Sequence, residues 1–86
     1  MRFEFTATAQ KDIKKIDKTT QKQIVKKLNF FIDQPEPLKY AAKLTGFSGG
    51  GDYRFRIGRY RVVFDLVKDT ILVLYVEHRR EIYRKR

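Results

Sequence analysis

The stretch Tyr53-Arg54-Phe55-Arg56-Ile57-Gly58-Arg59-Tyr60-Arg61-Val62-Val63-Phe64 decides the fold of this 86-residue chain. Polar and apolar residues alternate on both sides of Gly58-Arg59, and two such runs joined by a two-residue glycine turn are typical of a β-hairpin. A two-residue loop also fixes the register of the two strands. The expected cross-strand pairs are Ile57–Tyr60, Arg56–Arg61, Phe55–Val62 and Arg54–Val63.

The alternation gives this hairpin two chemically different faces, because successive side chains of a strand point to opposite sides. The apolar face is assigned to the core and consists of Tyr53, Phe55, Ile57, Tyr60, Val62 and Phe64. The other face carries Arg54, Arg56 and Arg61. Like charges directly opposite each other destabilise a sheet, so Arg56 and Arg61 indicate an anion site, with phosphate as the obvious ligand. Alternatively, these arginines are only solubilising, and Asp65 pairs with one of them.

The segment before the hairpin predicts a strand followed by two helices. Residues 2–6 alternate with period two, as a short strand does, and from Thr8 the apolar spacing becomes helical. A turn at 17–20 precedes the second helix, with Thr19 or Thr20 as its N-cap, and Gln34-Pro35 ends it. The apolar positions of the two helices are Ala9, Ile13, Ile16, Ile24, Val25, Leu28, Phe31 and Ile32. We expect a short antiparallel helix pair.

Residues 38–51 form the least regular stretch, which Leu38, Leu44 and Phe47 are expected to hold onto the core. Its glycine triplet at 49–51 precedes a strand rather than a helix N-terminus, which disfavours a phosphate-binding loop. After the hairpin, Lys68-Asp69 marks a second tight turn, and residues 71–76 are apolar on both faces, as in a covered strand. The sequence therefore predicts one α+β domain over residues 1–86, with two N-terminal helices packed on one face of a small, mainly antiparallel twisted sheet (β-α-α-β-β-β).

Composition restricts the classes of function. The formal charge is +10, which favours a polyanion or an acidic protein as partner. The chain has no cysteine and one histidine, which excludes disulfides and thiolate metal sites, so no metal or cofactor is expected. No apolar run approaches the roughly 20 residues of a membrane span, and no secretory signal is visible, so we expect a cytoplasmic protein with no membrane partner.

The C-terminal run Glu77-His78-Arg79-Arg80-Glu81-Ile82-Tyr83-Arg84 combines arginines, the one histidine and a phenol. Phosphodiester cleavage needs such groups, because cations stabilise the charge that develops on the phosphate and other groups take and give a proton. The alternative is a basic tail with Tyr83 anchored on the core and His78 on the surface.

The ordered pattern Lys43-Leu44-Thr45-Gly46, Tyr53-Arg54-Phe55-Arg56, Gly58-Arg59-Tyr60-Arg61-Val62-Val63-Phe64 and His78-Arg79-Arg80-Glu81-Ile82-Tyr83 resembles the RelE/ParE toxin superfamily of type II toxin–antitoxin modules. The resemblance covers nearly the whole chain. It implies a fold similar to that of microbial ribonucleases and neutralisation by a separately encoded, acidic, RelB-like antitoxin. RelE-type members cut mRNA in the ribosomal A site without a metal, so ribosome and mRNA become expected partners and inhibition of translation the expected outcome.

The resemblance also implies roles for individual residues. Arg54, Arg56 and Arg61 match cationic positions of the sheet, Arg79 matches the arginine after the last strand, and Tyr83 matches a tyrosine that orients the substrate base. The best-studied RelE proteins carry lysines where this chain has Arg54 and Arg56, and arginine effectively cannot give up its proton. General-base duty then falls on His78 or Tyr83 or is shared with ribosomal groups, and we name His78 provisionally because it titrates in the useful range.

Three other functions stay open at this stage. ParE-type members of the superfamily inhibit DNA gyrase and are not nucleases, although they generally lack the tyrosine that this chain has at position 83. A non-catalytic basic nucleic-acid-binding module needs only arginines and exposed aromatic residues. A degenerate toxin would retain only antitoxin binding.

Overall fold

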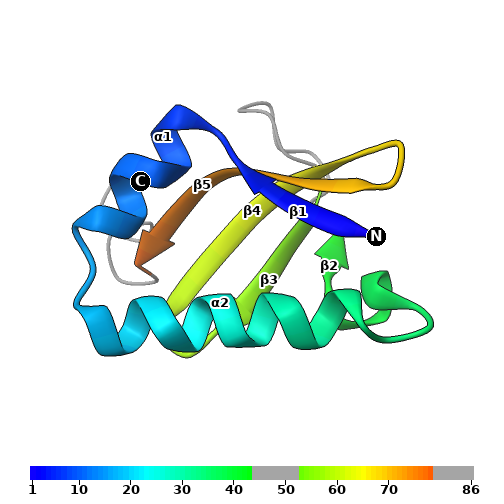
Figure 1. The fold of residues 1–86 in the computed structure, drawn as a ribbon, viewed down its shortest axis with the longest axis horizontal. Coiled ribbons are helices and arrows are strands. Elements are labelled where there is room, and N and C mark those ends of the chain that lie inside the picture. Colours follow the sequence, from blue (N-terminus) through cyan, green and yellow to red (C-terminus); the bar gives the residue numbers. More distant parts are fainter. Residues whose placement is uncertain (44–52, 79–86) are drawn as a thin grey trace.

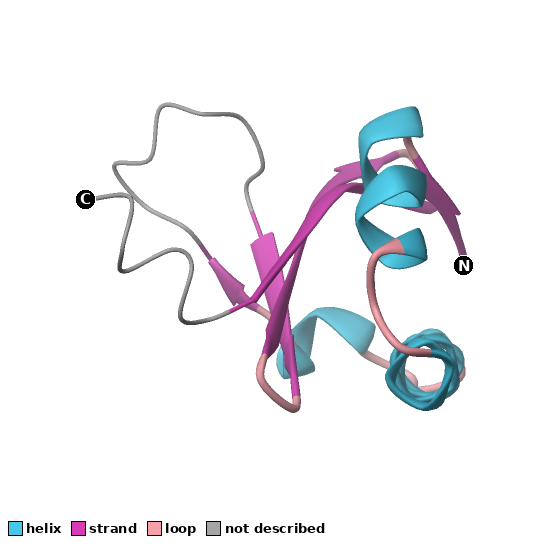
Figure 2. Ribbon diagram, turned by 90° about the vertical axis from the view of Figure 1, so that its left-hand side faces the viewer, coloured by secondary structure: helices cyan, strands magenta, loops and turns pink. Residues whose placement is uncertain are grey.

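The computed structural model describes residues 1–43 and 53–78 and shows two helices on one side of a five-stranded sheet (Figures 1 and 2). The strands occur in the order β1-β5-β4-β3-β2 across the sheet. The elements along the chain are β1 (Arg2–Phe5), α1 (Ala7–Lys14), α2 (Lys18–Ile32), the 3-10 helix η1 (Pro37–Tyr40), β2 (Ala42–Lys43), β3 (Tyr53–Ile57), β4 (Tyr60–Val67) and β5 (Thr70–His78). The predicted α+β class and helix placement are confirmed.

The hairpin of β3 and β4 has the predicted register. Arg56 pairs with Arg61 and Ile57 with Tyr60, so Gly58-Arg59 is a two-residue loop. Gly58 takes φ 59° while Arg59 does not have a positive φ, the pattern that a type II′ turn requires. The turn between β4 and β5 also falls where it was predicted, with Lys68 at φ 55°. β1 is the one strand that pairs in parallel among those described, lying beside β5.

A β-bulge in β5 changes which side chains face the core. Val63 of β4 pairs with Tyr75 while the next residue of β4, Phe64, pairs with Val73, which leaves Leu74 as the extra residue. Thr6 stabilises the bulge, because its Oγ1 donates to the Leu74 carbonyl at 2.8 Å. Before the bulge the odd-numbered residues of β5 face the core, and after it the even-numbered ones do.

The helices begin at side-chain caps. Thr6 Oγ1 accepts the Ala9 N–H at 3.1 Å at the start of α1. The N-cap of α2 is Asp17, whose carboxylate accepts the Thr20 N–H at 3.0 Å and the Thr20 hydroxyl at 2.7 Å. The prediction of Thr19 or Thr20 as N-cap is therefore wrong, and Thr20 is instead the donor to the cap. These bonds hold the pKa of the Asp17 carboxyl below its ordinary value of 3.8.

The two helices do not form the expected antiparallel pair. They cross at a steep angle, with α2 running beneath the sheet and α1 standing beside the end of β5 (Figures 1 and 2). Asp12 of α1 reaches the edge of β5 beyond the end of β1 and accepts the Val76 N–H at 3.0 Å. Each helix is thus held by the sheet and covers a different part of it, which the apolar spacing of the helices alone does not reveal.

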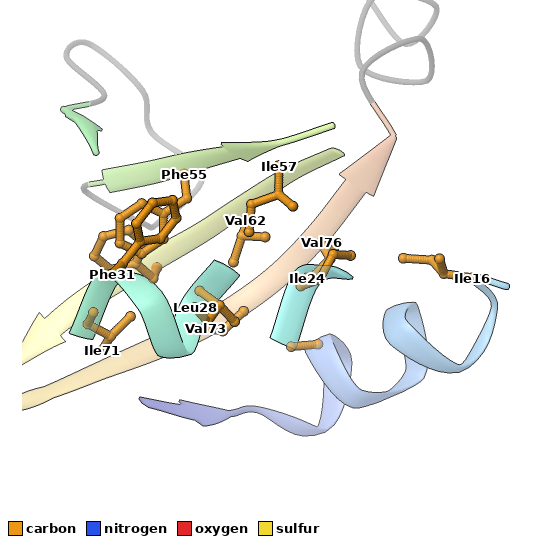
Figure 3. Close-up of a cluster of buried hydrophobic side chains, with 12 residues drawn as sticks. Ile16, Ile24, Leu28, Phe31, Phe55, Ile57, Val62, Ile71, Val73 and Val76 are labelled. Atoms are coloured by element: carbon orange, nitrogen blue, oxygen red, sulfur yellow. The ribbon is translucent and has the colours of Figure 1, made fainter. Parts of the chain in front are cut away.

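The core lies between the helices and the sheet and is dominated by stacked aromatic rings (Figure 3). Phe55 lies between Phe31, at 4.4 Å between ring centroids, and Phe64, at 4.5 Å. The fully buried members include residues of α2 and of every central strand: Ile24, Leu28, Phe55, Val62, Phe64, Ile71 and Val73. Val25, which was expected in the apolar stripe, is 37% exposed. The buried stripe on α2 is therefore narrower than predicted.

The segment expected to be an irregular loop contains two short elements. η1 begins at Pro37, and β2 adds a fifth strand because Ala42 pairs with Arg54 and Lys43 with Tyr53. Leu38 packs against the core, as predicted. The predictions for Leu44, Phe47 and the glycine triplet at 49–51 lie outside the described residues.

Candidate anion-binding face of the sheet

Arg54, Arg56 and Arg61 lie together on one face of the sheet, as predicted. Their core-facing neighbours Phe55 and Val62 are fully buried beneath the helices, so the arginines point to the other side. Both α1 and α2 lie over the core side, and no other helix is present among residues 1–43 and 53–78 apart from η1 (Figure 2).

The pairing of the strands arranges this arginine face in rows that run across the sheet. In one row Arg56 of β3 pairs with Arg61 of β4, and Arg61 pairs with Glu77 of β5. The next row contains Arg54, Val63 and Tyr75 in the same order of strands. The face therefore carries three cations, one carboxylate and one phenol within two neighbouring rows.

The arginine face is partly removed from solvent. Arg54 and Arg61 are half-buried, and the Nε atom of each is buried, whereas Arg56 is exposed. Val63 is only 2% exposed although it lies outside the core cluster on this opposite face. A cation on a partly desolvated surface attracts an anion more strongly than one in open water, because the effective dielectric constant is lower there.

The charged residues of these rows act on the pKa of Tyr75. Burial raises the pKa of its phenol above the ordinary value of 10.0, the nearby carboxylate of Glu77 raises it further, and Arg61 acts in the opposite direction. Tyr75 therefore remains a neutral phenol at physiological pH. The register of β4 and β5 places these three residues in neighbouring rows, Tyr75 in one row and Arg61 and Glu77 in the next.

The structure does not bring His78 together with the arginines. His78 pairs with Tyr60, its ring meets the Tyr60 ring edge-on at 5.0 Å, and Tyr60 packs against the core cluster on the helix side. The bulge in β5 causes this placement, since it shifts the alternation by one residue and turns Glu77 rather than His78 toward Arg61. The role of His78 as a base stays a prediction.

His78 instead lines a groove of about 490 Å³ between α1 and the end of β5. Asp12 of α1 and Lys15, the C-cap of α1, line this groove together with Tyr60 of β4. The residues that line it are Thr8, Asp12, Lys15, Ile16, Tyr60, Tyr75, Val76, Glu77 and His78.

Two of the predicted site residues, Arg79 and Tyr83, lie outside the described residues, as do Arg80 and Arg84. Two groups on the arginine face, Tyr75 and Glu77, were missed by sequence reasoning. The run from 71 to 76 is apolar at nearly every position, so it gives no alternation from which the side of Tyr75 or Glu77 could be read.

The chemistry available on the arginine face is that of anion binding and proton transfer. Guanidinium groups bind phosphate oxygens through paired N–H donors. Among residues 1–43 and 53–78 the structure shows no group of three or more histidine, aspartate or glutamate side chains placed to hold a metal ion. None of the helices in this described part is long and apolar enough to cross a membrane.

Comparison with known proteins shows what the chain is similar to. The family described as ParE toxin of type II toxin-antitoxin system, parDE, matches residues 3–83. A chain of the toxin–antitoxin complex RelBE2 from Mycobacterium tuberculosis is 26% identical, with a TM-score of 0.76, and the match covers 91% of this chain and 96% of that chain.

Other solved structures are similar over a comparable length. A chain of the RelB-RelE antitoxin–toxin complex from Methanococcus jannaschii is 29% identical, with a TM-score of 0.68 and coverage of 92% and 93% of the two chains. The isolated RelE toxin of E. coli is 26% identical, with a TM-score of 0.67 and coverage of 96% and 90%. No curated protein sequence matches the chain significantly.

Proposed function

Since the chain belongs to the ParE toxin family of type II toxin–antitoxin systems, within the RelE/ParE superfamily, we propose that it is the toxin that cleaves mRNA in the ribosomal A site and so inhibits translation. The observation that carries this proposal is the direct pairing of Arg56 with Arg61 on the face of the sheet away from the helices, with Arg54 in the adjacent row. Two like charges in register destabilise a hairpin, and a phosphate bound between them removes that repulsion.

The proposed reaction is an attack of the ribose 2′-hydroxyl on the adjacent phosphorus. The phosphorane that forms carries more negative charge than the substrate, so guanidinium groups fixed on a sheet stabilise it more than they stabilise the substrate. Arg54, Arg56 and Arg61 would supply this stabilisation, with Arg79 and Tyr83 as further candidates from the sequence. The reaction needs no metal ion and takes place in the cytoplasm, where the ribosomes are.

The proposed partner outside the ribosome is an acidic, RelB-like antitoxin. The similar chains from M. tuberculosis and M. jannaschii belong to toxin–antitoxin complexes, RelBE2 and RelB-RelE. In this chain the net charge of +10 gives a surface that an acidic partner complements. Co-expression of the small gene next to the toxin gene is expected to abolish growth inhibition.

Inhibition of DNA gyrase is the second candidate, because the matching family is described as the ParE toxin. One experiment separates the two functions. The purified protein is added to ribosomes programmed with a defined mRNA, new 5′ ends are mapped, and DNA supercoiling by gyrase is measured in parallel. We expect cleavage in the A-site codon and unchanged supercoiling, whereas inhibited supercoiling without new 5′ ends would overturn the proposal.

A further inference from the structure

A carboxylate lies in the same row as the paired arginines. Glu77 of β5 is in register with Arg61 of β4, which is in register with Arg56 of β3. Neighbouring strands are about 4.8 Å apart, so the side chain of Glu77 lies next to that of Arg61 on this face. Glu77 is half-buried, and its charge acts on Tyr75 in the opposite direction to that of Arg61.

Glu77 attracts Arg61 and so offsets part of the repulsion between Arg61 and Arg56, but it also repels a phosphate that binds beside Arg61. The arginines of the face cannot accept a proton, since their guanidinium groups stay charged. Tyr75 is a neutral phenol and its raised pKa makes it a donor rather than an acceptor. His78 lies on the helix side with Tyr60. Among the described residues of these two rows, Glu77 is left as the group able to take a proton.

We propose that Glu77 is the catalytic proton acceptor of the arginine face; this inference rests on the proposed ribonuclease function. The Glu77 carboxylate takes the proton of the ribose 2′-hydroxyl as the bond from the 2′-oxygen to phosphorus forms. The bond from phosphorus to the 5′-oxygen then breaks, and that oxygen takes a proton from water. The products are a 2′,3′-cyclic phosphate and a 5′-hydroxyl end, and Glu77 returns its proton to solvent.

The test is the single-turnover rate of mRNA cleavage on programmed ribosomes over a range of toxin concentrations. Glu77→Gln keeps the size and the hydrogen-bonding capacity of the side chain but cannot accept a proton. We expect a fall in the maximal rate of about 100-fold or more, with the half-saturating toxin concentration unchanged or lower because a charge that repels phosphate is gone. Glu4→Gln is the matched control, since Glu4 pairs with Leu72 on β5, away from the arginine rows, and its rate should equal that of wild type.

The outcomes separate this inference from the proposed function. A wild-type protein that fails to cleave overturns both, whereas a wild type that cleaves beside a Glu77→Gln variant of equal maximal rate overturns only the role of Glu77. If the Glu77→Gln variant reaches the wild-type rate at saturating toxin concentration, Glu77 acts in binding, and its role as proton acceptor is overturned. If Glu77→Gln does not fold, Glu77→Asp is measured in its place. Its carboxylate is withdrawn by one methylene, so the maximal rate should fall about tenfold. An unchanged maximal rate contradicts the proposal.

Discussion

The pairing of Arg56 with Arg61 makes a prediction about stability that is independent of any function. Because Ile57 and Tyr60 close the two-residue hairpin, Arg56 and Arg61 form the next pair of the ladder, in which side chains approach most closely. We expect that replacing Arg56 by glutamine raises the free energy of unfolding, whereas replacing Arg61 removes the same repulsion but also its attraction to Glu77, which is in register on its other side. Replacing Arg56 once Arg61 is already glutamine should bring little gain, since the repulsion between the two arginines is then gone.

The expected size follows from the charges and their surroundings. Two unit charges about 7 Å apart interact by about 0.6 kcal/mol in bulk water, and more where the effective dielectric constant is lower. Arg61 is half-buried while Arg56 is exposed, so the repulsion should exceed the bulk-water value without reaching that of a buried pair. We expect a coupling of about 0.5–1 kcal/mol at low salt. It should fall toward zero at about 1 M salt, where the screening length is about 3 Å.

The measurement is a double-mutant cycle in urea with Arg56→Gln, Arg61→Gln and the double variant, at low and at high salt. Arg59→Gln combined with Arg61→Gln is the control, since Arg59 lies in the turn and its effect should add to that of Arg61→Gln. A coupling that is attractive, or that does not change with salt, would refute the reasoning and with it the claim that these two arginines are placed at the expense of stability.

Three further predictions concern the scaffold. Thr6→Ala removes both the acceptor for the Ala9 N–H and the donor to the Leu74 carbonyl, so it should lower the free energy of unfolding, measured in urea, by about 1–2 kcal/mol. Thr6→Ser keeps the hydroxyl and should retain most of the wild-type stability. Equal losses for the two variants would contradict a role for the two hydrogen bonds. Gly58→Ala should lower the free energy of unfolding by about 1–2 kcal/mol. The cause is backbone strain alone, because an added Cβ meets nothing within 4 Å. A stabilised variant would show that the turn tolerates a different φ. The pKa of Asp17 is lower in the folded chain than in the unfolded chain. The carboxylate therefore contributes to the free energy of unfolding above the unfolded-state pKa, and this contribution is lost as pH falls through the folded-state pKa. Thermal melts should therefore show the midpoint of wild type falling more steeply below about pH 4 than that of Asp17→Asn, and parallel curves would contradict the cap.

The hairpin could be predicted residue by residue because its determinants are local. Gly58 at the first position of a two-residue turn fixes the register, and strict alternation on both sides then assigns every side chain to a face. The placement of Arg54, Arg56 and Arg61 follows from nothing more distant than their neighbours in the sequence.

The features that sequence reasoning missed depend on tertiary contacts. The bulge at Leu74 is stabilised by Thr6, which lies far away in the sequence, and it alone decides that Glu77 rather than His78 faces Arg61. The position of α1 beside β5 includes the hydrogen bond that the Val76 N–H donates to Asp12, which lies 64 residues away in the sequence. The cap of α2 was assigned to the wrong residue because Asp17 and the threonines after it are all good N-caps.

The central claim is that the arginine face is where mRNA is cleaved, and one comparison tests it most directly. Arg61→Ala and Arg59→Ala remove the same side chain from the same hairpin, one on the arginine face and the other in the turn. On programmed ribosomes we predict that Arg61→Ala lowers the cleavage rate by about 100-fold or more, whereas Arg59→Ala cleaves at nearly the wild-type rate. Equal rates for the two variants would contradict the account.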